Sequence, residues 1–156
     1  MSEFDGQLRP VGRVAILTSR YNEVVTGKLL TGARECCRAA GVPDDQVDTV
    51  WVPGAFELGV AAAVAARSGR YAAIVALGAV IRGDTPHFDF VAGEASRQLG
   101  SVALETGVPV GFGLLTTEDL AQALARAGGT AGNKGYEACE AALRAADVVR
   151  ALREAR

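Results

Sequence analysis

The sequence predicts a single-domain α/β fold, a three-layer sandwich in which helices cover both faces of a four-stranded parallel sheet. Four short apolar runs rich in β-branched residues alternate with segments that repeat apolar residues at helical spacing. The runs are almost continuously apolar, which is typical of strands that are buried on both faces. With 156 residues, of which 49% are hydrophobic and 22% charged, the chain suits one domain with its own core.

The expected elements follow one another as β-α-β-α-β-α-β-α-α, an alternation that implies parallel strands joined by right-handed crossovers. The strands are expected at residues 14–18, 47–52, 72–77 and 108–114. Helical patterns run through residues 25–40, 56–64 and 88–102, and two more helices are expected at 119–127 and 134–153. Thr116 or Thr117 could cap the helix at 119–127, and Gly128-Gly129 is expected to end it.

Charge, hydropathy and cysteine content exclude several classes of protein. The formal net charge of −2 lacks the basic character of a nucleic-acid-binding domain. No apolar run reaches the roughly 20 residues that span a bilayer, and residues 1–10 are too polar for a signal peptide, so a cytoplasmic protein is expected. The three cysteines have no metal-ligand spacing and predict no metal site. Residues 1–11 are expected to form a flexible arm or a short extra strand.

The candidate site lies directly after the strands, because ligands of open parallel sheets bind beyond the carboxyl ends. Aromatic rings there suit an aromatic ligand, and a carboxylate suits ligand hydroxyls or ring N–H groups. A glycine-bearing turn that opens a helix suits an anion such as phosphate. The residues of interest are Tyr21 after the first strand, Phe56 and Glu57 after the second, segment 78–87 with the single histidine His87 after the third, and Phe112 near the end of the fourth.

Each of these residues also has a structural interpretation. Tyr21 and Phe56 could simply cover the sheet. Glu57 and Thr85 could be helix caps or first-turn residues. His87 could be a surface residue at a helix start. Their convergence on one edge of the sheet favours a binding site.

Arg126 poses a geometric problem. It lies at the far end of the helix at 119–127, which at 1.5 Å per residue carries it roughly 13 Å back from the ligand-binding edge. It should therefore miss the pocket of its own subunit. Arg126 is either an ordinary surface arginine or part of a pocket on a neighbouring subunit, and the second interpretation requires a homo-oligomer.

Seven short motifs in order carry a family resemblance. They are RYN at 20–22, WVPGAFE at 51–57, LGAVIRG at 77–83, TPHFD at 85–89, LTTE at 115–118, RAG at 126–128 and AGNKG at 131–135. Together, and at these spacings, they are specific. From Gly12 to about Val148 the chain resembles the 6,7-dimethyl-8-ribityllumazine synthase family.

This resemblance implies a flavodoxin-like topology and an enzyme of riboflavin biosynthesis. The family condenses 5-amino-6-(D-ribitylamino)uracil with 3,4-dihydroxy-2-butanone 4-phosphate to 6,7-dimethyl-8-ribityllumazine, with release of phosphate and water. It uses no metal and no organic cofactor. Its members form pentamers, some of which pair into decamers or close into sixty-subunit shells, with active sites between adjacent subunits. The short turn at 128–135 resembles that of shell-forming members and favours a sixty-subunit shell.

The resemblance also implies roles for individual residues. On the pyrimidine substrate, Tyr21 matches a stacking residue and Glu57 a contact to the ribityl hydroxyls. The other matches on this side are Ala55 and Phe56, the backbone of Ala79, Val80 and Ile81, and Phe112, which an adjacent subunit supplies.

On the butanone phosphate, Asp84 and Thr85 match loop contacts. Because Asp84 is acidic, its backbone N–H rather than its carboxylate must serve the phosphate. Arg126 matches a phosphate-binding residue from the adjacent subunit, and Lys134 matches a supporting basic residue. His87 matches a proposed proton-transfer residue.

Two other functions are consistent with the fold. The chain could be a flavin- or lumazine-binding assembly protein that does not catalyse, although the joint presence of Glu57, His87 and Arg126 argues against this. It could also be a flavodoxin-like electron carrier, which would leave Arg126 and Lys134 without a role. Appearance of lumazine absorbance from the two substrates discriminates the enzyme from both.

Overall fold

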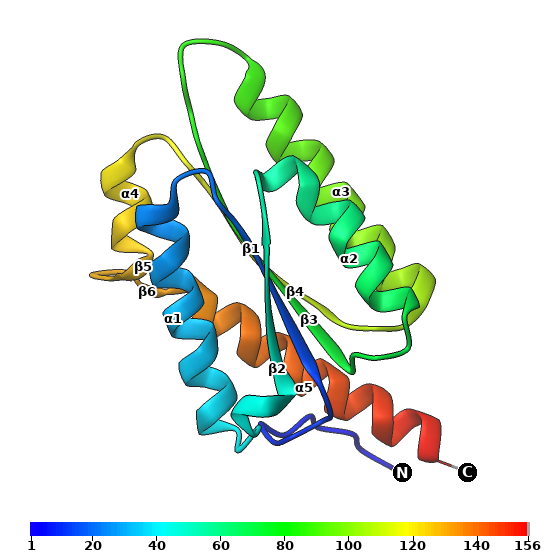
Figure 1. Ribbon diagram of the computed structural model, residues 1–156. Coiled ribbons are helices and arrows are strands. Elements are labelled where there is room, and N and C mark those ends of the chain that lie inside the picture. Colours follow the sequence, from blue (N-terminus) through cyan, green and yellow to red (C-terminus); the bar gives the residue numbers. More distant parts are fainter. Residues whose placement is uncertain (156) are drawn as a thin grey trace.

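A computed structural model describes residues 1–155 and contains the expected parallel sheet, with strands in the order β2-β1-β3-β4 (Figure 1). All three neighbouring pairs are parallel. The sequence prediction of an α/β domain with a four-stranded parallel sheet is therefore confirmed. The strands are β1 (Val14–Ser19), β2 (Val47–Val52), β3 (Ala73–Ile81) and β4 (Val110–Thr117), and a separate antiparallel pair comprises β5 (Ala127–Gly129) and β6 (Gly132–Asn133).

Helices cover both faces of the sheet and complete the three layers. In Figure 1, α1, α4 and α5 lie on one face, and α2 and α3 on the other. Among residues 1–155, no helix combines the length and the apolarity needed to cross a membrane. The helices are α1 (Glu23–Ala39), α2 (Leu58–Arg67), α3 (His87–Thr106), α4 (Leu120–Ala125) and α5 (Lys134–Glu154), with 3-10 turns η1 (Asp44–Gln46) and η2 (Ala55–Glu57).

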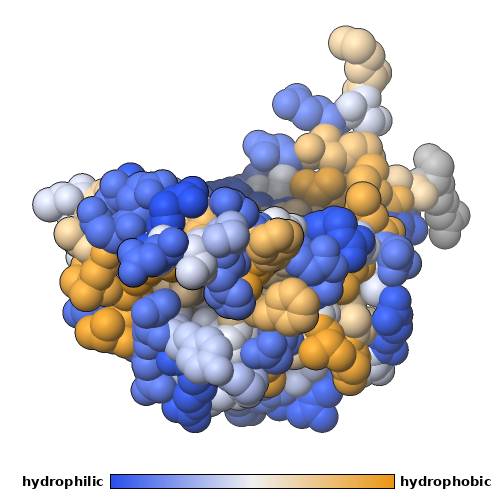
Figure 2. All heavy atoms as spheres, turned by 90° about the horizontal axis from the view of Figure 1, so that it is seen from above, coloured by the Kyte–Doolittle hydropathy of each residue, from blue (hydrophilic) through white to orange (hydrophobic). Residues whose placement is uncertain are grey.

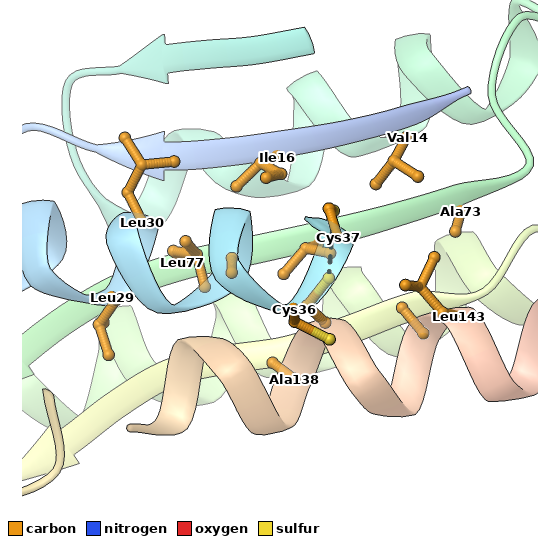
Figure 3. Close-up of a cluster of buried hydrophobic side chains, with 14 of the residues drawn as sticks. Val14, Ile16, Leu29, Leu30, Cys36, Cys37, Ala73, Leu77, Ala138 and Leu143 are labelled. Carbon is orange, nitrogen blue, oxygen red and sulfur yellow. Dashed lines mark hydrogen bonds between the residues drawn. The ribbon is translucent and has the colours of Figure 1, made fainter. Parts of the chain in front are cut away.

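The central strand β1 divides the core into two clusters. Its side chains alternate between faces, so Val14 and Ile16 pack toward α1 and α5, as Figure 3 shows, whereas Ala15 and Leu17 pack toward α2 and α3. All four side chains are fully buried. Burial of a Val, Leu or Ile side chain stabilises the fold by roughly 2 kcal/mol, and burial of Ala15 by less. The core therefore fixes the sheet, and the sheet fixes where its carboxyl ends lie.

Two strands extend further toward the site than the sequence pattern predicted. The third strand was expected to end at Leu77, but β3 continues to Ile81 because residues 78–81 still pair with β4. The fourth was expected to end at Leu114, but β4 continues to Thr117. Gly78 was assigned to a loop, yet it lies within β3, where a Cβ would come 2.9 Å from Cδ1 of Leu114. That glycine reflects tight packing rather than a turn.

The helix expected at 119–127 is shorter, and its predicted caps were wrong. α4 ends at Ala125, so Arg126 occupies its C-cap and the residues after it form the β5–β6 hairpin. Asp119, not Thr116 or Thr117, caps its start by accepting a hydrogen bond from the backbone N–H of Gln122 at 2.8 Å. Gly128-Gly129 does not end the helix; both residues belong to β5.

The apolar pattern at 56–64 marks a helix, but not its buried face. α2 buries Leu58, Ala62 and Ala66, whereas its Val60 and Val64 are exposed, as is Phe56 in the preceding turn η2. The helix is apolar nearly all round. Such a helix needs a second covering surface in addition to its own sheet.

Residues 6–9 lie against α5 and form no strand. The carboxylate of Asp147 accepts a hydrogen bond from the backbone N–H of Gln7 at 2.9 Å and pairs with Arg9 at 3.0 Å. Arg144 donates to the carbonyl of Gly6 at 3.0 Å. Of the two expectations for residues 1–11, the extra strand is wrong in this chain, and the arm is held in place by α5.

Candidate active site

A hollow of about 470 Å³ opens at the carboxyl ends of β1 and β2. We call it the Tyr21 hollow. Figure 2 looks down on this end of the molecule and shows apolar side chains grouped among hydrophilic ones. The lining brings together five of the residues expected at the site, since it consists of Tyr21, Gly54, Ala55, Phe56, Glu57, His87, Phe90 and Val91.

Backbone contacts hold Tyr21 at the mouth of this hollow. The N–H groups of Arg20 and Tyr21 both donate to the carbonyl of Pro53, at 3.1 and 2.9 Å, which ties the β1–α1 turn to the end of β2. The ring of Tyr21 lies over Gly54, where a Cβ would come 2.6 Å from its Cδ2. The side chain is 68% exposed. The open ring can stack on a flat ligand.

Glu57 combines a structural contact with a free acceptor. Its Oε1 accepts a hydrogen bond from the backbone N–H of Gly54 at 2.9 Å, and its own N–H donates to the carbonyl of Gly54 at 3.1 Å, so Glu57 caps the start of η2. The capping interpretation of Glu57 is therefore realised in the single chain. Within residues 1–155, its Oε2 accepts no hydrogen bond and can serve a ligand hydroxyl.

His87 is the first residue of α3, and the loop before it is exposed. The backbone N–H of His87 donates to Oγ1 of Thr85 at 3.4 Å, but the N-cap of α3 is Pro86, so Thr85 lies before the helix and is neither its cap nor a first-turn residue. Asp84 and Thr85 do not line the Tyr21 hollow. Arg82 anchors this loop through an ion pair with Glu118 at 2.9 Å.

The far end of β3 extends past β1 and leaves a backbone edge open. β1 pairs with β3 only as far as Leu77, whereas β3 pairs with β4 as far as Ile81. The backbone N–H and carbonyl groups of successive residues point to alternate sides of a strand. The N–H of Arg82 donates to β4, so the N–H and carbonyl groups of Ala79 and Ile81 point to the opposite side, where β1 has ended. The carbonyl of Ala79 accepts a hydrogen bond from Nδ2 of Asn22 at 2.9 Å. Within residues 1–155, no strand lies beside Ile81 on that side. Its backbone N–H and carbonyl can therefore form hydrogen bonds with a ligand.

A second hollow, of about 430 Å³, lies along β4 and shares no lining residue with the first. We call it the Arg126 hollow. β4 and β2 are opposite edges of the sheet, so the two hollows belong to different parts of the chain. Arg126 is thus separated from the Tyr21 hollow, as expected. The lining consists of Phe112, Leu114, Leu115, Thr116, Thr117, Arg126, Ala131, Lys134 and Glu137.

The β5–β6 hairpin brings two cations together in the Arg126 hollow. The backbone N–H of Lys134 donates to the carbonyl of Arg126 at 2.8 Å. The guanidinium of Arg126 donates to the carbonyl of Gln122 at 3.0 Å, which orients it along α4. Two cations beside the aromatic ring of Phe112 suit an anionic group such as phosphate.

Sequence reasoning missed Phe90, Val91 and Asn22. Phe90 is 72% exposed and lines the Tyr21 hollow one turn after His87. Its three-residue spacing from His87 places both on one helix face, and this signal was present in the sequence. Asn22 was seen only as part of a motif, because its contact with Ala79 joins residues 57 positions apart.

Fold and site together define a class: an α/β enzyme with an aromatic, acidic cradle at its strand ends and a basic hollow at the opposite sheet edge. The model of the 6,7-dimethyl-8-ribityllumazine synthase family matches residues 12–150, and the chain belongs to this family. It is a transferase-type enzyme that forms 6,7-dimethyl-8-ribityllumazine in riboflavin biosynthesis. The resemblance found in the sequence, and the reaction that it implied, are confirmed.

Proposed function

We propose that each active site of this enzyme is assembled from two chains. The Tyr21 hollow of one chain faces the Arg126 hollow of its neighbour, and substrates bind between them. One observation carries the proposal: within a chain, the cradle of Tyr21 and Glu57 and the cations Arg126 and Lys134 occupy separate hollows at opposite sheet edges. Neither hollow alone offers both the Tyr21–Glu57 cradle and a phosphate-binding pair of cations.

The pyrimidine substrate occupies the Tyr21 hollow in this proposal. Its ring stacks on Tyr21, and the free oxygen of Glu57 accepts from the ribityl hydroxyls. The open backbone edge at Ile81 pairs with polar atoms at the rim of the pyrimidine, as a neighbouring strand would. Ala55, Phe56, Ala79 and Val80 form the surrounding walls, and Phe112 of the neighbour covers the ring.

The butanone phosphate lies between the start of α3 and the neighbour's Arg126 hollow. Arg126 and Lys134 neutralise the phosphate, while the backbone N–H groups of Asp84 and Thr85 reach it from the loop. His87 moves a proton beside the reacting atoms.

The reaction needs few chemical groups from the protein. The substrate amine attacks the ketone and loses water to form an imine, phosphate then leaves, and attack of the second amine on the remaining carbonyl closes the ring with loss of a second water. Holding both substrates in register supplies most of the acceleration. Arg126 favours the departure of phosphate, because its positive charge stabilises the negative charge that the leaving group takes up.

The assembly that follows is a ring of chains. Every chain offers one hollow of each kind, so head-to-tail contacts close into a ring with one site per interface. We propose pentamers that close into a sixty-subunit shell, as the turn at 128–135 favours. The three free cysteines, all buried, suit the reducing cytoplasm in which we place the enzyme.

Mixing two inactive variants tests the shared site. Glu57→Ala damages the Tyr21 hollow and Arg126→Ala the other hollow, so each variant alone should lose activity. Co-refolded in equal amounts, they should regain about a quarter of the wild-type rate of lumazine formation, since that share of random interfaces pairs two intact hollows. Co-refolding Glu57→Ala with Phe56→Ala is the control and should regain nothing. A mixture of the first pair that stays inactive would refute the proposal.

A further inference from the structure

Asn22 holds a backbone conformation that side chains rarely adopt. Among residues 1–155 it is the one non-glycine residue with a positive φ, at φ 62° and ψ 44°. Such a conformation persists only where its surroundings hold it, and it recurs at functional sites. Asn22 directly follows Tyr21, the stacking residue of the Tyr21 hollow.

The side chain of Asn22 does not perform the usual task of an asparagine at a helix start. An N-cap side chain normally accepts hydrogen bonds from the first turn, as Oδ1 of Asn133 does at α5 from Gly135 and Tyr136 at 2.8 and 3.1 Å. At α1, the Asn22 side chain makes no capping hydrogen bond. Its amide Nδ2 donates instead to the carbonyl of Ala79 on β3, at 2.9 Å.

This contact takes the place of a strand. β1 stops pairing with β3 at Leu77, two residues before Ala79, and the chain turns away into α1. The Asn22 amide supplies a hydrogen-bond donor for the next β3 carbonyl on that side. The backbone carbonyl of Asn22 meanwhile accepts from the N–H groups of Val25 and Thr26, at 2.8 and 3.0 Å. One residue thus joins the turn that carries Tyr21, the start of α1 and the open edge of β3.

We propose that Asn22 is a positioning residue: its amide locks the Tyr21 ring and the open backbone edge at Ile81 at the relative placement that the pyrimidine substrate needs. This inference rests on the proposed binding of the pyrimidine in the Tyr21 hollow. Asn22 itself touches neither reacting atoms nor phosphate. Its loss weakens the grip on the pyrimidine and leaves the phosphate side unchanged.

The Asn22→Gly variant isolates the amide, because glycine adopts a positive φ without strain. Its KM for the pyrimidine substrate should rise about tenfold, the equivalent of one hydrogen bond. The KM for the butanone phosphate and kcat should stay at the wild-type values. Gln7→Gly is the control: it deletes an exposed amide that also donates to a backbone carbonyl, that of Asp5, and should change neither KM. Equal KM values in Asn22→Gly and wild type, or a fall in kcat alone, would overturn the proposal.

Hydrogen exchange provides a measurement without substrate. The N–H groups of Arg20 and Tyr21 donate to Pro53 from the turn that Asn22 locks, so both should exchange several-fold faster in Asn22→Gly than in wild type. Unchanged exchange would overturn the positioning role, even in an enzyme that makes lumazine. If exchange accelerates while the mixture of Glu57→Ala and Arg126→Ala stays inactive, the locking of the turn stands and the proposed shared site fails.

Discussion

Arg126 and His87 differ in how the chain supports them. Arg126 is held along α4 by its bond to the carbonyl of Gln122, and the hairpin sets it beside Lys134. His87 lies exposed at the first position of α3, and within residues 1–155 its ring has no hydrogen-bond partner that would fix a tautomer or orientation. Preorganised charge contributes more to a reaction than an unconstrained proton carrier does.

We therefore expect Arg126→Ala to lower kcat/KM more than His87→Ala does. A well-placed general acid or base contributes about 10²–10⁴-fold, and His87, with no partner, should fall at or below the lower end. Arg126→Ala should exceed that loss, because in the proposed site a guanidinium can form paired hydrogen bonds to phosphate that the single ammonium of Lys134 cannot replace. Steady-state kinetics of both variants against both substrates measure the order. A larger loss in His87→Ala would contradict it.

Individual site residues were predictable where they directly follow strands. Tyr21, Phe56, Glu57 and His87 share one hollow because parallel strands end at one edge, a rule that needs no coordinates. Asn22 and its contact with Ala79 were not predictable, because a side-chain bond across two strands depends on how far each strand extends. The sequence pattern placed the end of the third strand at Leu77, four residues before Ile81. It therefore did not reveal that β3 extends past β1.

At the level of elements, the contact between residues 6–9 and α5 depends on one carboxylate. Asp147 is only 2% exposed, and its partners are Gln7, Arg9 and Arg150. The backbone N–H of Gln7 and the guanidinium of Arg150 lower the pKa of Asp147. Because the pKa is lower in the folded chain than in the unfolded one, ionised Asp147 stabilises the fold above the unfolded pKa.

Stability should therefore fall as acid protonates Asp147. Its contribution is complete above about pH 5 and is lost as the pH drops below roughly 4, through the lowered folded pKa. Asp147→Asn should cost about 2 kcal/mol of unfolding free energy at pH 7 and flatten this acid limb. Urea unfolding across the pH range checks both effects, with Asp45→Asn, an exposed aspartate, as the control. An acid limb as steep as that of wild type would show that other carboxylates cause it.

At the scale of the whole molecule, a single chain leaves several large apolar side chains of α2 and α3 exposed. Val60 and Val64 on α2 and Leu104 on α3 are all largely exposed, next to the groove between these helices. The sequence predicted α2 correctly as a helix, but it could not show that the apolar stripe of Val60 and Val64 points away from the sheet. A stripe buried by a neighbouring chain and one buried in the core have the same pattern.

A charge in this stripe should dissociate the assembly. In Val64→Glu, a buried unpaired carboxylate would oppose the contact between chains, and light scattering should detect monomers. Activity should fall with the assembly, since each proposed site needs two chains. Leu152→Glu alters an exposed apolar residue near the end of α5 and should leave the mass unchanged. A Val64→Glu protein that keeps the wild-type mass would exclude α2 from the interface.

The overhang of β3 beyond β1 affects how this enzyme can vary during evolution. Groups offered at Ile81 belong to the peptide unit, so exchanging the side chain leaves them in place. Proline alone among the standard residues would delete the N–H at that position. In the proposed site, part of the recognition of the pyrimidine is thereby protected from most missense changes, whereas the contacts assigned to Glu57 or Arg126 can be lost through one substitution.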